Sequence, residues 1–191
     1  MFLLRPPSEE SIRKFLREQA SLAFSYDAVG TTATTPPHSY RIDHNRIPLG
    51  DGIDLFERAK EAVRRWAMFD LGWVKLIPPE TPIEPGRSVA VLARHFGFWS
   101  LHACRIVYVI EIDSDVKGFG FAYGTLPDHA ERGEERFTVE FHQQDNSVWY
   151  DILAFSTPNH LIARLGFPVT RSLQKKFALD SKSAMLRVVR L

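Results

Sequence analysis

The chain has 191 residues, of which 45% are hydrophobic and 25% are charged, a composition typical of a folded globular protein. Its 24 Lys and Arg residues nearly balance 23 Asp and Glu residues, so net charge gives no reason to expect binding to nucleic acid. The single Cys104 excludes an intramolecular disulfide and a cysteine-rich zinc site. No apolar run approaches the ~20 residues that span a bilayer, and the apolar start stops at Arg5, too early for a signal-peptide core. We therefore expect a cytoplasmic protein.

The first third of the chain predicts two helices separated by a polar segment. The first helix is expected over residues 8–20, with Ser8 as its amino-terminal cap. Residues 30–37 are rich in Thr and Pro and indicate a loop, and residues 40–47 form a weak, polar strand. The second helix, over residues 54–69, has the clearest pattern, because apolar side chains recur at helical spacing opposite a charged face.

Between residues 88 and 157 the hydrophobic period changes to two. Short connections there favour antiparallel neighbours in a meander. We expect five strands, over residues 88–96, 101–112, 117–126, 134–143 and 148–157. A short helix over residues 160–165 and a long C-terminal helix from Pro168 complete the chain.

Helices segregated from an antiparallel sheet predict an α+β fold. The economical arrangement is a curved antiparallel sheet wrapped around the long C-terminal helix, which buries both. Without a repeat or a long linker, the chain predicts a single domain over residues 1–191. Within it, residues 1–39 form an N-terminal helix and loop, and residues 40–191 form the core.

Five short motifs add to this element order: Tyr-Asp-Ala-Val-Gly-Thr (26–31), Tyr-Gly-Thr-Leu-Pro-Asp-His (123–129), Gly-Glu-Glu-Arg-Phe (133–137), Phe-Ser-Thr-Pro (155–158) and Arg-Ser-Leu-Gln (171–174). They resemble the uncharacterised protein family 0548, a domain of unknown function, although that family commonly has Arg where Thr157 stands. The element order resembles the helix-grip fold of the START and birch-pollen-allergen superfamily. The resemblance implies a bent sheet, a long helix and a cavity between them, and brings no reaction or cofactor.

Candidate ligand-binding side chains alternate along two of the expected strands. Phe119, Phe121 and Tyr123 share one strand face. His102 and Tyr108 lie in phase with the apolar residues of the preceding strand, which predicts that both point inward. Facing a cavity, such residues can hold an apolar molecule or transfer a proton; the alternative is that the rings fill the core and the histidine is a hydrogen-bonded core residue.

A second set of candidates lies near the end of the sheet. His129, Glu134 and Glu135 can sit at the mouth of a cavity and share a proton or a metal, but their spacing matches no recognised metal motif. The alternative is a rigid hairpin whose carboxylates bond backbone N–H groups or pair with Arg171. Arg171 and Gln174 lie one helical turn apart, and either fix the C-terminal helix to this hairpin or bind a ligand carboxylate or phosphate.

We therefore expect a protein that binds a small apolar or amphipathic molecule between the sheet and the C-terminal helix, with no metal and no cofactor. The usual nucleophile, phosphate-loop, zinc-protease and dinucleotide motifs are missing from the sequence. Two alternatives stay open. One is an enzyme of the cyclase, hydrolase or isomerase type that uses His102, His129 or Glu134 as acid or base. The other is a scaffold with a filled core that docks a protein partner through residues 123–137 or the aromatic tip at residues 96–99.

Overall fold

The structure is a computed structural model that describes residues 1–159 and 167–190; the short helix expected over residues 160–165 lies outside them. Within the described residues, eight strands form one antiparallel sheet in the order β2-β8-β7-β6-β5-β4-β3, with β1 paired to β5. The strands are β1 (Phe2–Leu3), β2 (Arg41–Asp51), β3 (Val74–Ile77), β4 (Ser88–His95), β5 (Phe98–Ile112), β6 (Val116–Thr125), β7 (Glu131–His142) and β8 (Ser147–Pro158). The helices are α1 (Glu9–Ala20), α2 (Ile53–Arg64) and α4 (Phe167–Val189), with 3-10 turns η1 (Thr31–Ala33) and η2 (Ala67–Phe69).

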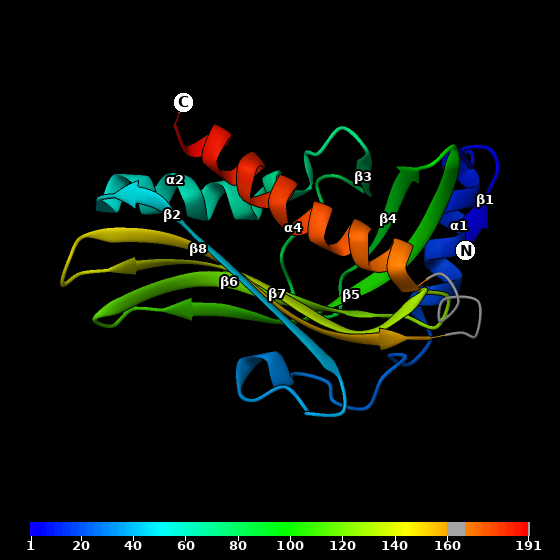
Figure 1. Ribbon diagram of the computed structural model, residues 1–191, viewed down its shortest axis with the longest axis horizontal. Coiled ribbons are helices and arrows are strands. Elements are labelled where there is room, and N and C mark those ends of the chain that lie inside the picture. Colours follow the sequence, from blue (N-terminus) through cyan, green and yellow to red (C-terminus); the bar gives the residue numbers. More distant parts are fainter. Residues whose placement is uncertain (160–166, 191) are drawn as a thin grey trace.

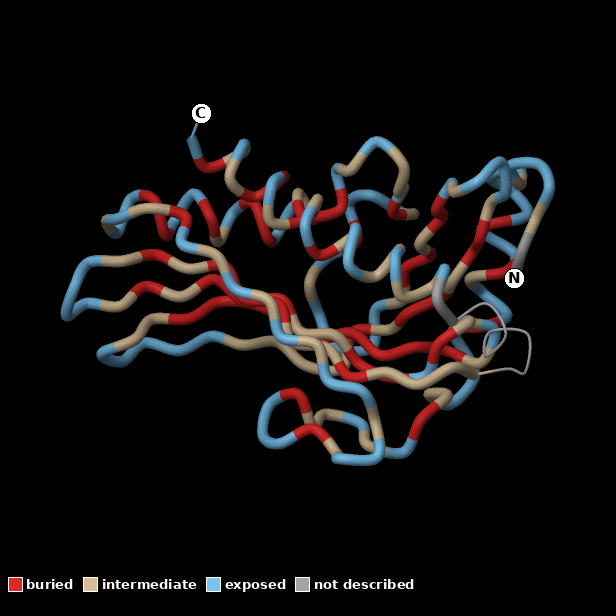
Figure 2. The backbone as a smooth tube through the Cα atoms, viewed as in Figure 1, coloured by how far each residue is buried: buried red, intermediate tan, exposed pale blue. Residues whose placement is uncertain are grey.

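The two faces of the curved sheet are covered differently. The helices α2 and α4 cover one face, here called the inner face, whereas η1 lies across the opposite, outer face (Figure 1). Buried residues run along the central strands of the sheet, as the red segments of Figure 2 show, and in β6 both side-chain phases are buried from Gly118 to Thr125. The large apolar cluster joins the inner face to α2, η2 and α4. The arrangement confirms the expected α+β fold, in which a curved antiparallel sheet holds a long C-terminal helix.

A second, smaller cluster holds α1 on the outer face. Ile12 and Phe15 pack against Leu101 and Leu126, which belong to the opposite side-chain phase of the sheet. Ser8 caps this helix by accepting a hydrogen bond from the backbone N–H of Ser11, as the sequence predicts. Both faces of the β4–β5 region are therefore covered.

The helix expected over residues 54–69 is shorter than predicted. It ends at Arg64, and Trp66 takes a left-handed conformation with φ of 57°. The buried indole Nε1 of Trp66 donates to the carbonyl of Thr81 at 2.8 Å, which offsets the cost of this backbone conformation. The chain then turns into η2 and carries Phe69 onto the inner face of the sheet.

Glycines on the outer face of β6 permit two close approaches. A Cβ at Gly120 would lie 2.1 Å from the carbonyl oxygen of Phe137, and a Cβ at Gly124 would lie 2.1 Å from the hydroxyl of Tyr26. The neighbouring strand and the N-terminal segment therefore pack directly on the β6 backbone. No helix in the described part of the chain is long and apolar enough to cross a membrane.

A cavity beneath the C-terminal helix

A cavity of about 1180 Å³ lies between the inner face of the sheet and the first half of α4. Leu173 and Phe177 of α4 line it from above, together with Phe69 of η2 and Trp73 just before β3. Its walls include residues from β2, β4, β5, β6, β7 and β8. The volume lies above the range of roughly 300–1,000 Å³ that is usual for small-molecule sites.

Small side chains on the sheet explain why the space is open. Ala93, Ser100, Gly133 and Ala154 line the cavity on four different strands. At the other end of the inner face, large rings fill the space under α2, where Phe141 of β7 packs against Phe56 with ring centroids 6.1 Å apart. The same sheet therefore supports a packed core at one end and a cavity at the other.

The centre of the cavity wall carries a carboxyl–phenol pair. Tyr123 and Glu135 are directly opposite each other on β6 and β7, and the phenol donates to Glu135 Oε2 at 2.9 Å. Glu135 lies deep in the protein yet keeps some accessible surface, because it faces the cavity. Burial raises the pKa of Glu135 to about 7, so its carboxyl is protonated about half of the time at neutral pH.

Two histidines form one end of the cavity. The rings of His102 on β5 and His129 stack with centroids 4.4 Å apart. Burial lowers the pKa of His129 to about 3 and that of His102 well below its ordinary value, and the neighbouring His129 lowers the pKa of His102 further. His129 Nδ1 accepts a hydrogen bond from the backbone N–H of Glu131 at 3.0 Å. Both rings are therefore neutral at pH 7.

Arg171 and Gln174 fasten α4 to the far edge of the sheet rather than to the hairpin at residues 123–137. Arg171 donates to both carboxylate oxygens of Asp43 on β2 and to Gln174 Oε1. Gln174 Nε2 in turn donates to the hydroxyl of Ser156 on β8 at 3.2 Å. The alternative in which this arginine pairs with Glu134 or Glu135 is wrong, because Asp43 occupies its guanidinium.

Glu131 is a cavity residue that the sequence reasoning missed. Its side chain is 6% exposed and lines the cavity. Burial raises the pKa of Glu131 above its ordinary value, and the neighbouring Ser156 and Arg171 oppose this rise. Its Oε1 has no hydrogen-bond partner among the described residues. Side-chain alternation could have identified this residue, because Glu131 and Glu135 lie on the same face of β7. The residue was missed because this strand was expected to begin only at residue 134.

Glu134 points to the outer face, away from the cavity. Its carboxylate accepts from the Tyr26 hydroxyl at 2.7 Å, from the Gly30 N–H at 2.7 Å and from the Thr32 N–H at 3.0 Å. This residue therefore anchors the segment before β2 to the sheet. This agrees with the alternative in which the carboxylates of a rigid hairpin bond backbone N–H groups.

Tyr108 also lies on the outer face, which corrects the prediction that it points inward. The register with β6 shifts between Ile106 and Tyr108, so a β-bulge at Val107 reverses the side-chain phase. The Tyr108 hydroxyl shares a hydrogen bond of 2.7 Å with Thr32 Oγ1. Strict alternation across the whole strand could not reveal this extra residue.

Phe119 and Phe121 point inward as expected but do not line the cavity. Phe121 is 0% exposed, and its ring centroid lies 4.6 Å from that of Trp66. Phe119 is buried beneath the cationic side chains of Lys60 and Arg64 on α2. These two rings belong to the filled end of the inner face, and of the three aromatic candidates on β6 only Tyr123 lines the cavity.

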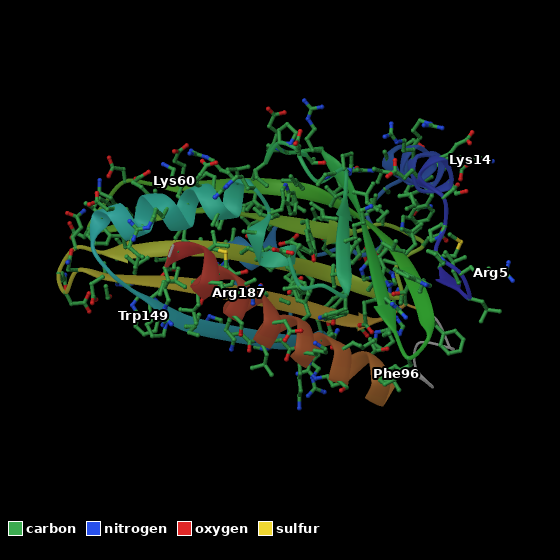
Figure 3. The ribbon with its side chains drawn as sticks, turned by 90° about the horizontal axis from the view of Figure 1, so that it is seen from above. Arg5, Lys14, Lys60, Phe96, Trp149 and Arg187 are labelled. Atoms are coloured by element: carbon green, nitrogen blue, oxygen red, sulfur yellow. The ribbon has the colours of Figure 1, made fainter. Side chains whose placement is uncertain are left out.

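The aromatic tip between β4 and β5 stands at the edge of the cavity. Phe96 is 74% exposed with φ of 49°, and Phe96 and Phe98 both belong to the cavity lining. Figure 3 shows Phe96 beside the N-terminal end of α4. In the described residues, no group of three or more His, Cys, Asp or Glu side chains is arranged to hold a metal ion.

Fold and cavity together define a class: a helix-grip protein with an interior space under its long helix. The crystal structure of human STARD10 shares this fold with a TM-score of 0.50 at 10% identity, covering 97% of this chain and 80% of that chain. The chain belongs to the family described as Domain of unknown function (DUF1990), whose profile matches residues 25–184.

Two relatives extend the similarity over nearly the whole length of the chain. A UPF0548 protein of Dictyostelium discoideum is 36% identical over 99% of this chain and 96% of its own. A UPF0548 protein of Deinococcus radiodurans is 35% identical over 98% of both chains. These matches confirm the family resemblance that the five sequence motifs indicate.

Proposed function

We propose that this protein binds a small apolar or amphipathic molecule in the cavity between the sheet and α4. The observation that carries the proposal is the cavity itself, about 1180 Å³ in volume. Protein interiors are close-packed and rarely leave voids larger than a water molecule. A space of this size is therefore expected to hold a molecule.

The lining supports an amphipathic occupant. Phe69, Leu173 and Phe177 offer apolar surface from the helix side, whereas Tyr123 and Glu135 present polar groups from the sheet. Apolar walls with a few convergent polar groups are typical of small-molecule sites. A purely polar molecule would leave the ring surfaces without contacts.

Native mass spectrometry tests the proposal directly. The purified protein is measured under native conditions and again after denaturation. We expect a reproducible extra mass that is released on denaturation, or, if the cavity empties during purification, saturable binding of the neutral dye Nile red. A protein that carries no extra mass and binds no Nile red would contradict the proposal.

A matched pair of variants locates the binding in the cavity. Ala154 lines the cavity, whereas the next residue, Leu153, does not line it and pairs with Arg136 and His44 in the opposite side-chain phase of β8. We expect Ala154→Phe to fill the space and weaken Nile red binding at least tenfold, and Leu153→Phe to leave it unchanged. Ala93→Leu repeats the test from β4, and cooperative thermal unfolding verifies that each variant is folded. Equal binding by all variants would place the dye elsewhere.

A second candidate function, acid–base catalysis, rests on the Tyr123–Glu135 pair. A carboxyl with a pKa of about 7 suits a general acid or base at neutral pH. If the protein converts the retained molecule, the mass of that molecule should change over time with the wild-type protein. The Glu135→Gln variant should still bind the molecule but should not convert it. The cavity favours ligand binding over a scaffold with a filled core. Subcellular fractionation tests the cytoplasmic location that we propose.

A further inference from the structure

The charged groups around the cavity are mostly acidic. Among the described residues that line it, Asp43, Glu131 and Glu135 contribute carboxyl groups, and Arg171 and Lys175 contribute cations. Lys175 is exposed to solvent. Glu134 also belongs to the lining, but its carboxylate bonds Tyr26, Gly30 and Thr32 on the outer face. An anionic head group in the cavity would therefore face more acidic side chains than buried cationic ones, which disfavours its binding.

The basic groups of the wall are not available to an anion. Arg171 already donates through both Nη atoms to the carboxylate of Asp43. Four histidines line the cavity. Burial lowers the pKa of three of them, His95, His102 and His129. The fourth, His44, shares a hydrogen bond of 2.5 Å with the carboxylate of Asp151. A carboxylate or phosphate would have to displace Asp43 from Arg171, which leaves a partly buried carboxylate without its partner.

Glu131 and Arg171 both line the cavity, and each carries one buried polar atom without a partner among the described residues. Glu131 Oε1 is a buried acceptor, and Arg171 Nε is a buried donor, and neither has a partner among the described residues. The two side chains are close enough for the Arg171 charge to lower the pKa of Glu131. Arg171 also donates to Gln174, and Gln174 donates to the hydroxyl of Ser156, which lines the cavity together with Glu131.

We infer that the molecule bound in this cavity is an amphiphile whose polar end is a hydroxyl group, recognised by Glu131 and Arg171, and that anionic head groups are rejected. A hydroxyl is both donor and acceptor, so it can donate to Glu131 Oε1 and accept from Arg171 Nε. An ammonium has donors only and leaves the arginine unmatched. A carboxylate has acceptors only and leaves Glu131 unmatched. The inference rests on the proposed function and names the chemical class of its ligand.

A series of three compounds with one alkyl chain tests the head group. 1-Dodecanol, dodecylamine and dodecanoate are compared at pH 7, below their micelle concentrations, by displacement of Nile red from the wild-type protein. A hydrogen bond to a charged group corresponds to roughly 10- to 100-fold in affinity. We expect dodecanol to bind at least about tenfold more tightly than dodecanoate and more tightly than dodecylamine.

The variant Glu131→Gln tests the assigned residue. It keeps the shape of the side chain and removes the charge that repels an anion, so the preference for dodecanol over dodecanoate should fall about tenfold. Glu57→Gln, on the exposed face of α2, is the matched control and should leave the preference unchanged. If Glu131→Gln does not fold, Ser156→Ala takes its place. It removes a cavity-lining hydroxyl that favours the charged form of Glu131 and should weaken dodecanol binding.

The outcomes separate this inference from the function on which it rests. Dodecanoate or dodecylamine binding as tightly as dodecanol would overturn the hydroxyl assignment, and so would a Glu131→Gln protein with the wild-type preference. Affinity that increases with alkyl chain length and ignores the head group would overturn the inference while supporting the cavity as a binding site. No binding of Nile red or of any of the three compounds would overturn both.

Discussion

Replacement of Glu135 by Gln should change how the stability of the protein depends on pH. Glu135 lies in the cavity wall, and burial raises its pKa from 4.5 to about 7. Each pKa unit corresponds to about 1.4 kcal/mol, so ionising this carboxyl in the folded protein costs about 3 kcal/mol. Gln preserves the shape and can still accept from the Tyr123 hydroxyl, but it does not ionise.

The direction follows from proton binding. Between pH 4.5 and 7 the folded protein holds a proton on Glu135 that the unfolded chain has lost, so the stabilising contribution present below pH 4.5 disappears as pH rises through 7. From pH 5 to pH 8, wild-type protein should therefore lose about 2 to 3 kcal/mol of unfolding free energy relative to Glu135→Gln.

Urea denaturation at pH 5, 6, 7 and 8 measures this difference. Groups common to both proteins titrate alike and cancel, and Glu57→Gln on the exposed face of α2 provides a variant in which the same chemical change should have no pH-dependent effect. A difference between wild type and Glu135→Gln that is constant with pH would refute the reasoning. So would a wild-type protein that gains stability relative to the variant as pH rises.

Two further predictions concern the outer face of the sheet. Glu134→Ala removes the acceptor for Tyr26, Gly30 and Thr32 and should cost at least about 2 kcal/mol; hydrogen exchange should show the amides of Gly30 and Thr32 losing protection, and retained protection would contradict the anchoring role. Gly120→Ala should destabilise the protein by at least about 2 kcal/mol more than Gly118→Ala in urea denaturation. The reason is that the new Cβ meets a backbone oxygen at 2.1 Å in the first case and only the Ile112 side chain at 3.6 Å in the second; equal losses would show that the β6–β7 contact can relax.

Much of the fold could be predicted because the decisive signals are local. The period of two from residue 88 onward follows from the alternation of side chains in an extended backbone, and it located β4 to β8. The cap at Ser8 and the proline near the start of α4 mark helix ends through the chemistry of one or two residues. The order of these elements was enough to indicate a sheet curved around the last helix.

The candidate site depended on contacts between distant parts of the chain. Arg171 is 128 residues from its partner Asp43, and no local pattern names Asp43 as the acid that occupies it. Trp66 follows α2 in a left-handed conformation, and the chain after it brings Phe69 into the cavity lining. The sequence could place Phe121 and Tyr123 on one strand face, but it could not show that Phe121 lies in the packed core and Tyr123 in the cavity wall.

Side-chain alternation by itself therefore determined the five strands β4 to β8 and, where the strand is regular, which way each residue points; it did not reveal β1 or β3. The tertiary structure alone decided the rest: a one-residue bulge sent Tyr108 to the outer face, and an earlier start of β7 brought Glu131 into the cavity wall. The physical reason is that alternation is a property of a single extended strand, whereas a bulge, a strand's starting residue and an empty volume are set by the register and packing of its neighbours.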